Sequence, residues 1–304
     1  MIFVNIEKQL KAIVGDVNVE VDKPLKNHTY TRLGGNADYF VTPTTFEQVQ
    51  EVVKLANEKD VPFMLLGNGS NLIIKDGGIR GMVVYLGELD QIRTTGNAIF
   101  AESGALIADV SKHALKDDLT GLEFACGIPG SVGGALFMNA GAYGGEIKDV
   151  LVRATVITKA GELKTLDASE LNLSYRTSNI SDNGYIVLEA EFGLVKGDHE
   201  AIKAVMDDLT FKRESKQPLE YPTCGSVFKR PPGHFAGKLI QDSELQGVGI
   251  GGAEVSLKHA GFIINKDNAT AKEYIALIEH VQKVVKEKYD VALEREVRII
   301  GEDK

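Results

Sequence analysis

Hydrophobic and polar positions follow two rhythms along this chain, one typical of helices and the other of strands. Helical spacing predicts helices over 45–59, 105–118, 198–213 and 270–288. Apolar or β-branched runs predict strands over 62–67, 82–86, 98–102, 185–195 and 297–300. Thr44 and Glu47 form a capping-box pattern before the first of these helices, and Lys159–Glu162 is typical of a hairpin turn. The mixture indicates an α+β protein.

The pattern changes near residue 197, where a β-branched region ends and a helix begins. We therefore expect an N-terminal module over 1–196, with lobes of about 1–82 and 83–196, and a smaller α+β domain over 197–304. We expect the last strand, about 291–304, to be able to pack back on the N-terminal module.

Composition narrows the class of protein. The 304 residues are 43% hydrophobic and 25% charged, which is typical of a globular protein with substantial cores. The formal net charge of −9 argues against a groove that follows nucleic acid phosphates. No apolar run approaches the roughly 20 residues that span a bilayer. The N-terminus predicts an amphipathic helix rather than a secretion signal.

Two cysteines, Cys126 and Cys224, are too few for a disulfide framework, and neither has metal-ligand spacing to another cysteine or histidine. The six histidines form no ligand spacing either, so we assign no metal. With few cysteines, no secretion signal and no bilayer-spanning run, the sequence leads us to expect a cytoplasmic protein. It also has no coiled-coil heptads, so we expect no obligate protein partner.

Glycine is concentrated in two of the segments. Gly67, Asn68, Gly69, Ser70 and Asn71 directly follow a predicted strand. Successive N–H groups in such a turn can form a nest for a phosphate. A tight connection between two elements explains the same residues equally well.

The second segment, 127–146, is both apolar and rich in glycine. It suits a flat aromatic ligand with a phosphate tail that lies against bare backbone, or else tight packing of a helix on a strand. Neither segment has the GxGxxG spacing of dinucleotide-binding proteins, and the chain has no GxxxxGK[ST] phosphate loop. A nucleotide triphosphatase is therefore not expected.

Six segments in order carry a resemblance to a known family. They are TRLGGNADYFV (31–41), GNGSN (67–71), GIPGSVGGALFMNAGAYGGE (127–146), YRTS (175–178), CGSVFKRP (224–231) and LEREVRIIG (293–301). Together they resemble the UDP-N-acetylenolpyruvoylglucosamine reductases, the MurB enzymes of bacterial cell-wall synthesis. The glycine motifs alone belong to a broader flavoprotein superfamily, whereas the last three segments are specific.

The resemblance implies a two-lobed FAD-binding module of the vanillyl-alcohol-oxidase/PCMH type, followed by a smaller α+β substrate-binding domain. It implies non-covalent FAD, NADPH as co-substrate, and UDP-N-acetylglucosamine enolpyruvate as the substrate that is reduced to UDP-N-acetylmuramate. The flavin would carry the hydride, while the protein binds, orients and supplies charge.

The resemblance also implies roles for single residues. Ser226 would donate the proton, while Arg176 and Glu296 would stabilise the intermediate. Lys229, three residues after Ser226, is a candidate for polarising its hydroxyl. The residues expected to bind FAD are Gly67, Asn68, Gly69, Ser70, Asn71, Gly127, Ile128, Pro129, Gly130, Ser131, Gly133, Gly134, Asn139, Ala140 and Gly141.

Positive charge for the anionic ligands is expected in segment 229–238, which carries Lys229, Arg230 and Lys238 and no acid. It is either a solvated basic loop or part of a wall that binds diphosphate. Asn265 resembles a substrate-binding position of the family. Segment 245–256 would lie over the substrate, or is a plain loop.

Only 50 positions separate Arg176 from Ser226, so the chain resembles the shorter form of the family, which lacks an inserted substrate-closing loop. Two alternatives remain at this point. One is a flavin oxidase of the same superfamily, and the other is a module that binds flavin or a sugar nucleotide without turnover.

Overall fold

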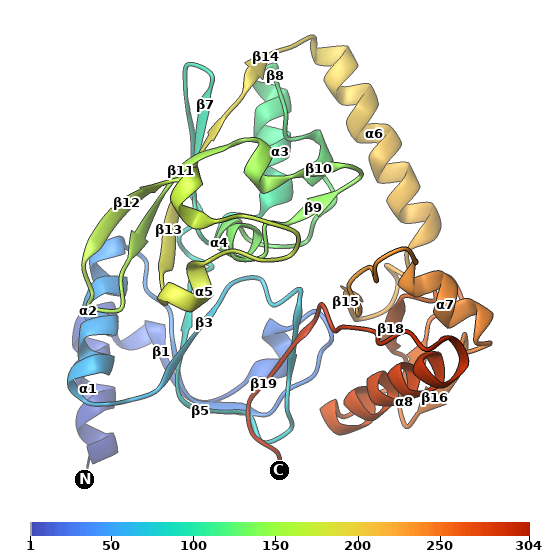
Figure 1. The fold of residues 1–304 in the computed structure, drawn as a ribbon. Coiled ribbons are helices and arrows are strands. Elements are labelled where there is room, and N and C mark those ends of the chain that lie inside the picture. Colours follow the sequence, from blue (N-terminus) through green and yellow to red (C-terminus); the bar gives the residue numbers. More distant parts are fainter. Residues whose placement is uncertain (1) are drawn as a thin grey trace. The chain divides into compact units, whose positions relative to one another are not determined.

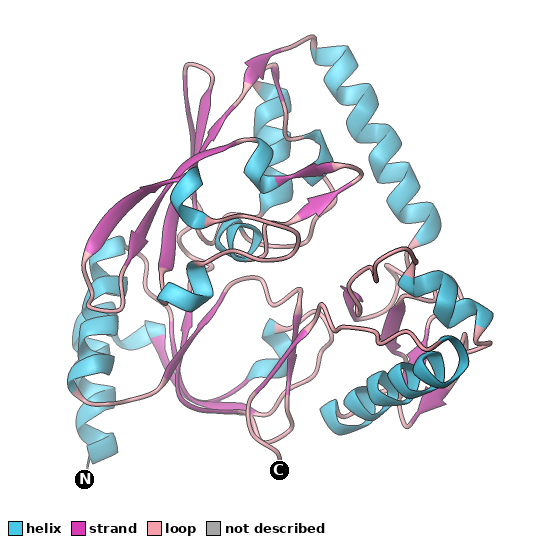
Figure 2. Cartoon of the chain, viewed as in Figure 1, coloured by secondary structure: helices cyan, strands magenta, loops and turns pink. Residues whose placement is uncertain are grey.

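The computed structural model describes residues 2–304, which form two compact units (Figure 1). Unit 1 comprises the residues up to Asp22, Asp38–Asn68 and Gly81–Phe211. Unit 2 comprises Lys23–Ala37, Gly69–Arg80 and Lys212–Lys304. Helices and strands are mixed in both units (Figure 2), as the sequence pattern predicted.

The first part of unit 1 is built on a four-stranded sheet with the order β1-β2-β5-β3. Its strands are β1 (Val19–Pro24), β2 (Asn36–Val41), β3 (Phe63–Leu66) and β5 (Ile79–Tyr85). Strands β3 and β5 are parallel. The accompanying helices are α1 (Ile2–Val14), η1 (Asp16–Asn18) and α2 (Phe46–Glu58). Helix α2 turns five apolar residues inward, because they recur at helical spacing: Val49, Val52, Val53, Leu55 and Ala56.

The second part of unit 1 is a five-stranded antiparallel sheet with the order β12-β11-β13-β7-β6. Its strands are β6 (Ile92–Thr95), β7 (Ala98–Glu102), β11 (Leu151–Ile157), β12 (Leu163–Asp167) and β13 (Ile186–Gly193). The other elements are α3 (Ile107–Lys116), η3 (Glu123–Ala125), α4 (Val132–Phe137), η4 (Ile147–Asp149), η5 (Ala168–Leu171) and α5 (Ile180–Asn183). Short strands pair as β9 (Gly141–Ala142) with β10 (Gly145–Glu146) and β8 (Leu119–Thr120) with β14 (Val195–Lys196).

Side chains alternate across this second sheet, as the period of two in a strand requires. One face contributes buried residues such as Ile99, Ala190 and Phe192 to a core shared with α3 and α4. The other face carries Arg153, Thr155 and Glu191, which are polar and partly or fully exposed. A second core in unit 1 is built mainly from residues between Ile6 and Leu89.

Unit 2 is centred on an antiparallel sheet with the order β15-β18-β17-β16. The strands are β15 (Thr223–Ser226), β16 (Gly249–Ile250), β17 (Ala253–Val255) and β18 (Phe262–Asn265). Helices α7 (Ala236–Asp242) and α8 (Ala271–Tyr289) share their core, and η2 (Leu25–His28) is the short helix of the first segment. The last strand, β19 (Arg298–Ile300), pairs in parallel with β4 (Leu72–Ile74). The C-terminal strand therefore packs on a segment from the first third of the sequence.

Local signals located most helices but misplaced some ends. The cap of α2 is Thr45, whose Oγ1 accepts from the Gln48 amide at 3.2 Å, and not Thr44. Helix α6 (His199–Lys216) begins near the expected residue and extends three residues beyond the predicted end. Its buried Met206 contacts Ser111 and the Cys126 thiol in unit 1. Because of those contacts most of α6 belongs to unit 1, and the boundary between the two units lies within the helix, between Phe211 and Lys212.

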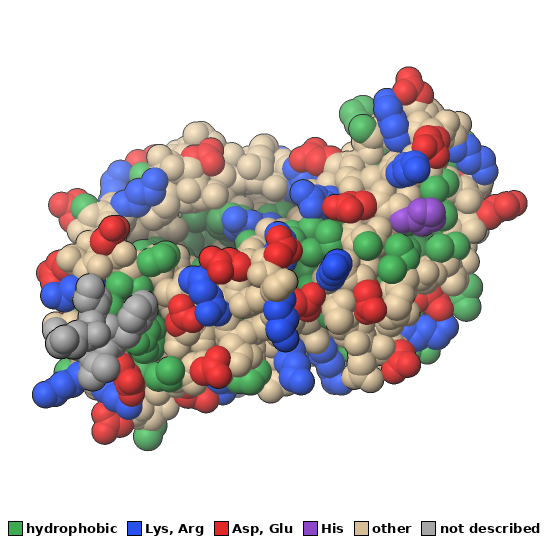
Figure 3. All heavy atoms as spheres, turned by 90° about the horizontal axis from the view of Figure 1, so that it is seen from below, with side chains coloured by type: hydrophobic (Ala, Val, Ile, Leu, Met, Phe, Trp, Pro, Cys, Tyr) green, Lys and Arg blue, Asp and Glu red, His purple; other side chains and the backbone are tan. Residues whose placement is uncertain are grey.

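Charged side chains of both signs are interspersed over the face drawn in Figure 3. Within residues 2–304, no helix combines the length and the apolar character that crossing a bilayer requires. In the same range, no group of three or more His, Cys, Asp or Glu side chains is arranged to hold a metal ion.

Candidate active site

The two glycine segments meet in unit 1. The Asn68 side-chain amide donates to the Pro129 carbonyl oxygen at 2.6 Å. Gly67 lies so close to Ser131 that a Cβ at this position would overlap the Ser131 hydroxyl. The turn after β3 and the start of the second segment are therefore two sides of one surface, separated by 61 positions in the sequence.

Loop 127–131 is held by backbone hydrogen bonds and is half-exposed, except for Ser131, which is buried. The Gly130 carbonyl oxygen accepts from the Ile107 amide at 3.0 Å, and the Val132 amide donates to Ala105. Ser131 caps α4 by accepting from the amide of Gly134, a residue that is exposed. Bare glycine backbone is thus held rigidly at a surface, which is what close approach of a flat, phosphate-bearing ligand requires.

The remaining residues of the first glycine segment belong to unit 2. The Gly69 carbonyl oxygen accepts from the Tyr30 amide at 3.1 Å, and the Asn71 side chain donates to the Glu296 carbonyl oxygen at 3.2 Å. Gly69 is buried, while Ser70 and Asn71 are half-exposed. Asn71 therefore has a role in holding the segment that carries Glu296.

Arg176 lies in unit 1 and is the second of the two central residues of a tight turn. Ser174 and Thr177 exchange two backbone hydrogen bonds at 3.0 and 3.1 Å, leaving Tyr175 and Arg176 as the turn residues. Arg176 has a φ of +55°, a left-handed conformation that is uncommon outside glycine. Its guanidinium donates to the Gly141 carbonyl oxygen at 3.1 Å, so the arginine motif and the second glycine segment are brought together.

Ser226 lies in unit 2 at the end of β15, where the strand contains a bulge. Thr223 pairs with Ile264 and Ser226 with Phe262, so β15 has one residue more than its partner in this interval. Gly225 takes up the irregularity with a φ of +78°. The bulge turns Ser226 outward, and the residue is exposed.

Glu296 is adjacent to this bulge within unit 2. Its amide donates to the Val227 carbonyl oxygen at 2.8 Å, and Phe228 forms an antiparallel bridge with Arg295. Burial raises the pKa of the neighbouring Cys224 thiol to about 11, and the Glu296 carboxylate contributes to the same shift. The structure therefore places the serine and glutamate motifs side by side.

The basic residues of 229–238 are at the surface and have protein partners. Lys229 Nζ lies 2.5 Å from Glu294 Oε1, and Lys238 Nζ lies 2.6 Å from Asp242 Oδ1. The Arg230 guanidinium stacks over the Phe235 ring at 3.9 Å. Asn265 is buried, and its amide donates to Thr31 O and accepts from Ala269 N.

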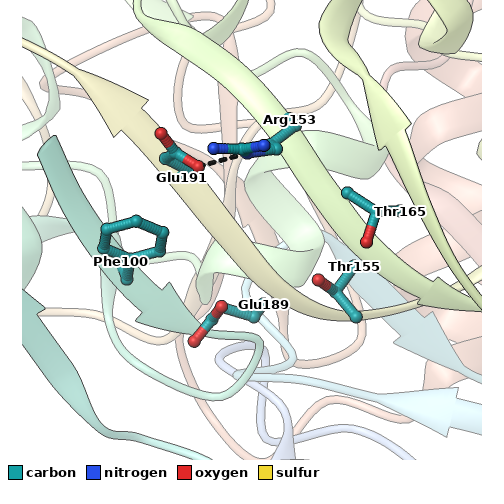
Figure 4. Close-up of a pocket in the computed structure, with 6 residues that line it drawn as sticks. All are labelled: Phe100, Arg153, Thr155, Thr165, Glu189 and Glu191. Atoms are coloured by element: carbon teal, nitrogen blue, oxygen red, sulfur yellow. Dashed lines mark hydrogen bonds and ion pairs between the residues drawn. The ribbon is translucent and has the colours of Figure 1, made fainter.

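A hollow on the outer face of the five-stranded sheet contains none of the predicted site residues (Figure 4). It is lined by Phe100, Arg153, Thr155, Thr165, Glu189 and Glu191. Arg153 and Glu191 pair across it, and burial raises the pKa of Glu189 despite the nearby Arg93 guanidinium. We interpret it as a polar sheet surface.

The motifs did not reveal the residues that hold the site together. Val227 bonds Glu296 through its backbone, which no side-chain pattern can show. Ser174 and Ser178 anchor the arginine turn. The sequence signal for them was proximity to Arg176: Ser178 ends the YRTS motif, and Ser174 directly precedes it.

Two family models match the chain. Residues 217–300 match the C-terminal domain of UDP-N-acetylenolpyruvoylglucosamine reductase, and residues 37–167 match an FAD binding domain. A reductase of that name from Oceanobacillus iheyensis is 68% identical over 97% of this chain and 96% of its own length. The chain belongs to the UDP-N-acetylenolpyruvoylglucosamine reductase family. This confirms the predicted FAD-binding module and the smaller α+β domain of the family.

Solved structures agree with this membership. The MurB reductase from Thermus caldophilus aligns with a TM-score of 0.80 and 32% identity, covering 92% of this chain and 97% of that one. The glucose dehydrogenase Phl p 4.0202 aligns with a TM-score of 0.51 and 16% identity, covering 62% of this chain and 44% of that one. The second likeness shows the fold alone. Taken with the FAD binding domain match and the MurB structure, it agrees with the predicted PCMH-type fold class of the FAD module.

Proposed function

We propose that the chain reduces UDP-N-acetylglucosamine enolpyruvate to UDP-N-acetylmuramate, with FAD as its cofactor and NADPH as the reductant, in peptidoglycan precursor synthesis. The observation that carries the proposal is the 68% identity over nearly the full length of a relative with this name. The motif residues Arg176, Ser226 and Glu296 are all present and held in defined backbone environments.

The residues present in unit 1 fit FAD. Gly67, Asn68 and the half-exposed loop 127–131 offer backbone at a surface, and the hydrogen bond from Asn68 fixes the two segments together. We assign the cofactor to this surface together with α4 and Ala140–Gly141. When bound, FAD supplies the transfer of hydride between NADPH and the enolpyruvyl group.

Arg176 has the task of stabilising negative charge. A hydride that adds to the terminal carbon of an enolpyruvyl ether pushes an electron pair toward the carboxylate as an enolate. A fixed cation beside that carboxylate lowers the barrier because its position is set before the charge develops. The bond to Gly141 and the tight turn give the guanidinium such a fixed position.

Ser226 completes the reaction by transferring its hydroxyl proton to the α-carbon, so that a C–H bond forms as the O–H bond breaks. The serine oxygen then regains a proton from water. Glu296 is held next to the serine strand, and we assign it to the same intermediate. Lys229, Arg230 and Lys238 are proposed to bind the substrate, with Lys229 and Lys238 exchanging their carboxylate partners for phosphate. Asn265 is buried and bonded to backbone groups, so we propose that it supports this surface from within.

The proposal is tested with the purified protein under anaerobic conditions. We expect the yellow colour of oxidised flavin, its loss on addition of NADPH, and its return on addition of UDP-N-acetylglucosamine enolpyruvate. Recovery of the colour only with oxygen would instead identify a flavin oxidase. Protein that binds flavin but never exchanges electrons would be a binding module. The cytoplasmic location remains a prediction.

A further inference from the structure

We propose that Asn139 is a positioning residue that fixes the turn carrying Arg176, and that it acts on the reaction only through that arginine. The inference rests on the proposed function, since it deepens the role of Arg176. The sequence placed Asn139 among the FAD-binding residues. Its surroundings favour a different role.

Asn139 is completely buried, with an exposed fraction of 0%. Its Nδ2 donates to the Ser174 carbonyl oxygen at 3.0 Å and to Glu146 Oε2 at 2.6 Å. Its Oδ1 accepts from the Lys148 amide at 2.9 Å. Both amide hydrogens are thus used within unit 1, and no atom of the side chain reaches the surface where a cofactor would lie.

The Ser174 carbonyl group is the important partner, because Ser174 closes the turn around Tyr175 and Arg176. The same peptide segment is anchored after the turn by Ser178, whose Oγ donates to the Phe137 carbonyl oxygen at 2.8 Å. Arg176 itself is anchored at Gly141. Three side-chain hydrogen bonds therefore connect the turn to residues 137–141. Asn139 is the most deeply buried of the three residues that donate them.

The backbone of Asn139 explains why this anchor is placed so accurately. Asn139 has a φ of +42°, and asparagine is enriched in that left-handed region. Asn139 follows the end of α4 after one residue, Met138, which is the C-cap of the helix. The side chain therefore projects from a fixed point at the end of a helix. Because Arg176 also has a positive φ, the turn needs such external bonds to keep its conformation.

The test uses the holoenzyme variant Asn139→Gly, which tolerates the positive φ but lacks the amide. Asn172→Gly is the matched control, because Asn172 is exposed and has a similar φ of +47°. We expect Asn139→Gly to slow reoxidation of the flavin by the enolpyruvyl substrate by about 10²-fold, the scale of a small misplacement. Flavin content and reduction by NADPH should stay near wild type. The control should change none of these.

A double-mutant cycle separates positioning from general damage. In an Arg176→Ala background, single-turnover measurements should show Asn139→Gly costing less than about threefold, because the group it positions is gone. Ser178→Ala, which removes a different anchor, should behave in the same way if Asn139→Gly proves too unstable to purify. A full additional loss in the Arg176→Ala background would overturn the proposal, as would loss of FAD from Asn139→Gly.

Hydrogen exchange tests the anchor independently of activity. The amides of Ser174 and Thr177 should exchange faster in Asn139→Gly than in wild type or Asn172→Gly. Failure of the wild-type protein to reduce the substrate would show that the proposed function is wrong. Unchanged exchange at these two amides in Asn139→Gly would show, independently, that the positioning role is wrong.

Discussion

The backbone amide of Glu296 donates to the carbonyl oxygen of Val227 at 2.8 Å. Val227 directly follows Ser226, so the proposed proton donor and the proposed acidic residue share one stretch of hydrogen-bonded backbone. The bridge between Phe228 and Arg295 and the bond from Lys229 N to Glu294 O extend the same pairing. A change in the geometry of β15 should therefore reach Glu296 as well.

Ser226→Ala should leave reduction of the flavin by NADPH unchanged and slow its reoxidation by the enolpyruvyl substrate by about 10²-fold or more, as expected for a lost general acid. Rapid-mixing absorbance measurements separate the two half-reactions. Ser243→Ala removes a hydroxyl bonded to Leu239 O and should have wild-type rates. Wild-type reoxidation by the Ser226 variant would remove this serine from the mechanism.

Gly225→Ala should slow the same half-reaction by misdirecting Ser226. A Cβ on Gly225 would meet no atom within 4 Å, so the substitution costs only the positive φ, about 1–2 kcal/mol of stability. Gly96 has a φ of +63° and equally open surroundings. Gly96→Ala should therefore lose a similar free energy of unfolding while keeping wild-type rates. Equal kinetic losses in both variants would contradict a specific role for the bulge.

The sequence was most informative where structure is local. Helix α8 begins at a capping box of Thr270 and Glu273, so its start could be predicted from four adjacent residues. Strands β4 and β17, each of three residues, are too short to show an alternating pattern. The pairing of β19 with β4 joins segments more than 200 positions apart, and nothing near either strand specifies it.

The same limit applies to the candidate site. Arg176, Ser226 and Glu296 became candidates because their segments resemble motifs of the family, and their roles remain proposals. The structural roles of Asn139 and Asn265 could not be predicted from the sequence, because they depend on carbonyl oxygens of distant residues, Ser174 and Thr31. A buried asparagine that satisfies backbone groups and one that binds a ligand look alike in a sequence.

Gly67→Ala should weaken FAD binding. The new Cβ would overlap the Ser131 hydroxyl, which must then leave its position as the cap of α4. Losing such a cap costs about 1 kcal/mol of folding stability, and the displaced loop should raise the Kd for FAD. Ser131→Ala makes room for the methyl group, so the double variant should bind FAD more tightly than the two single losses added together. Strict additivity, measured by flavin titration, would show that Gly67 acts in another way.

Lys229 should bind substrate phosphate more effectively when Glu294 no longer competes for it. Because exposed ion pairs contribute only about 0.2–1 kcal/mol, Glu294→Gln should lower the KM for the sugar nucleotide by no more than about fivefold. Lys229→Met should raise it, and the difference should shrink at high salt. Lys283→Met breaks another surface pair, with Glu287, and is the control. An unchanged KM in both Lys229 and Glu294 variants would exclude this lysine from the phosphate site.

Cys224 should be inert in the folded protein, although it lies two residues from Ser226. Burial raises the pKa of its thiol from 9.0 to about 11, so the thiolate fraction near neutral pH falls by about 10²-fold. Cys126 is only half-buried. In a Cys126→Ser background we expect maleimide to label Cys224 only after unfolding. Labelling of native Cys224 as fast as Cys126 in wild type would contradict this environment.

The same shift makes stability depend on pH in one direction. Between pH 9.0 and about 11 the unfolded thiol loses its proton while the folded thiol keeps it, so the folded state binds more protons. Stability from Cys224 is therefore complete below pH 9.0 and is lost as the pH rises toward 11. In urea unfolding, the free energy of unfolding of wild type relative to that of Cys224→Ala should therefore decrease as the pH rises across this interval. A difference that stays constant with pH would mean that the thiol ionises equally easily in both states.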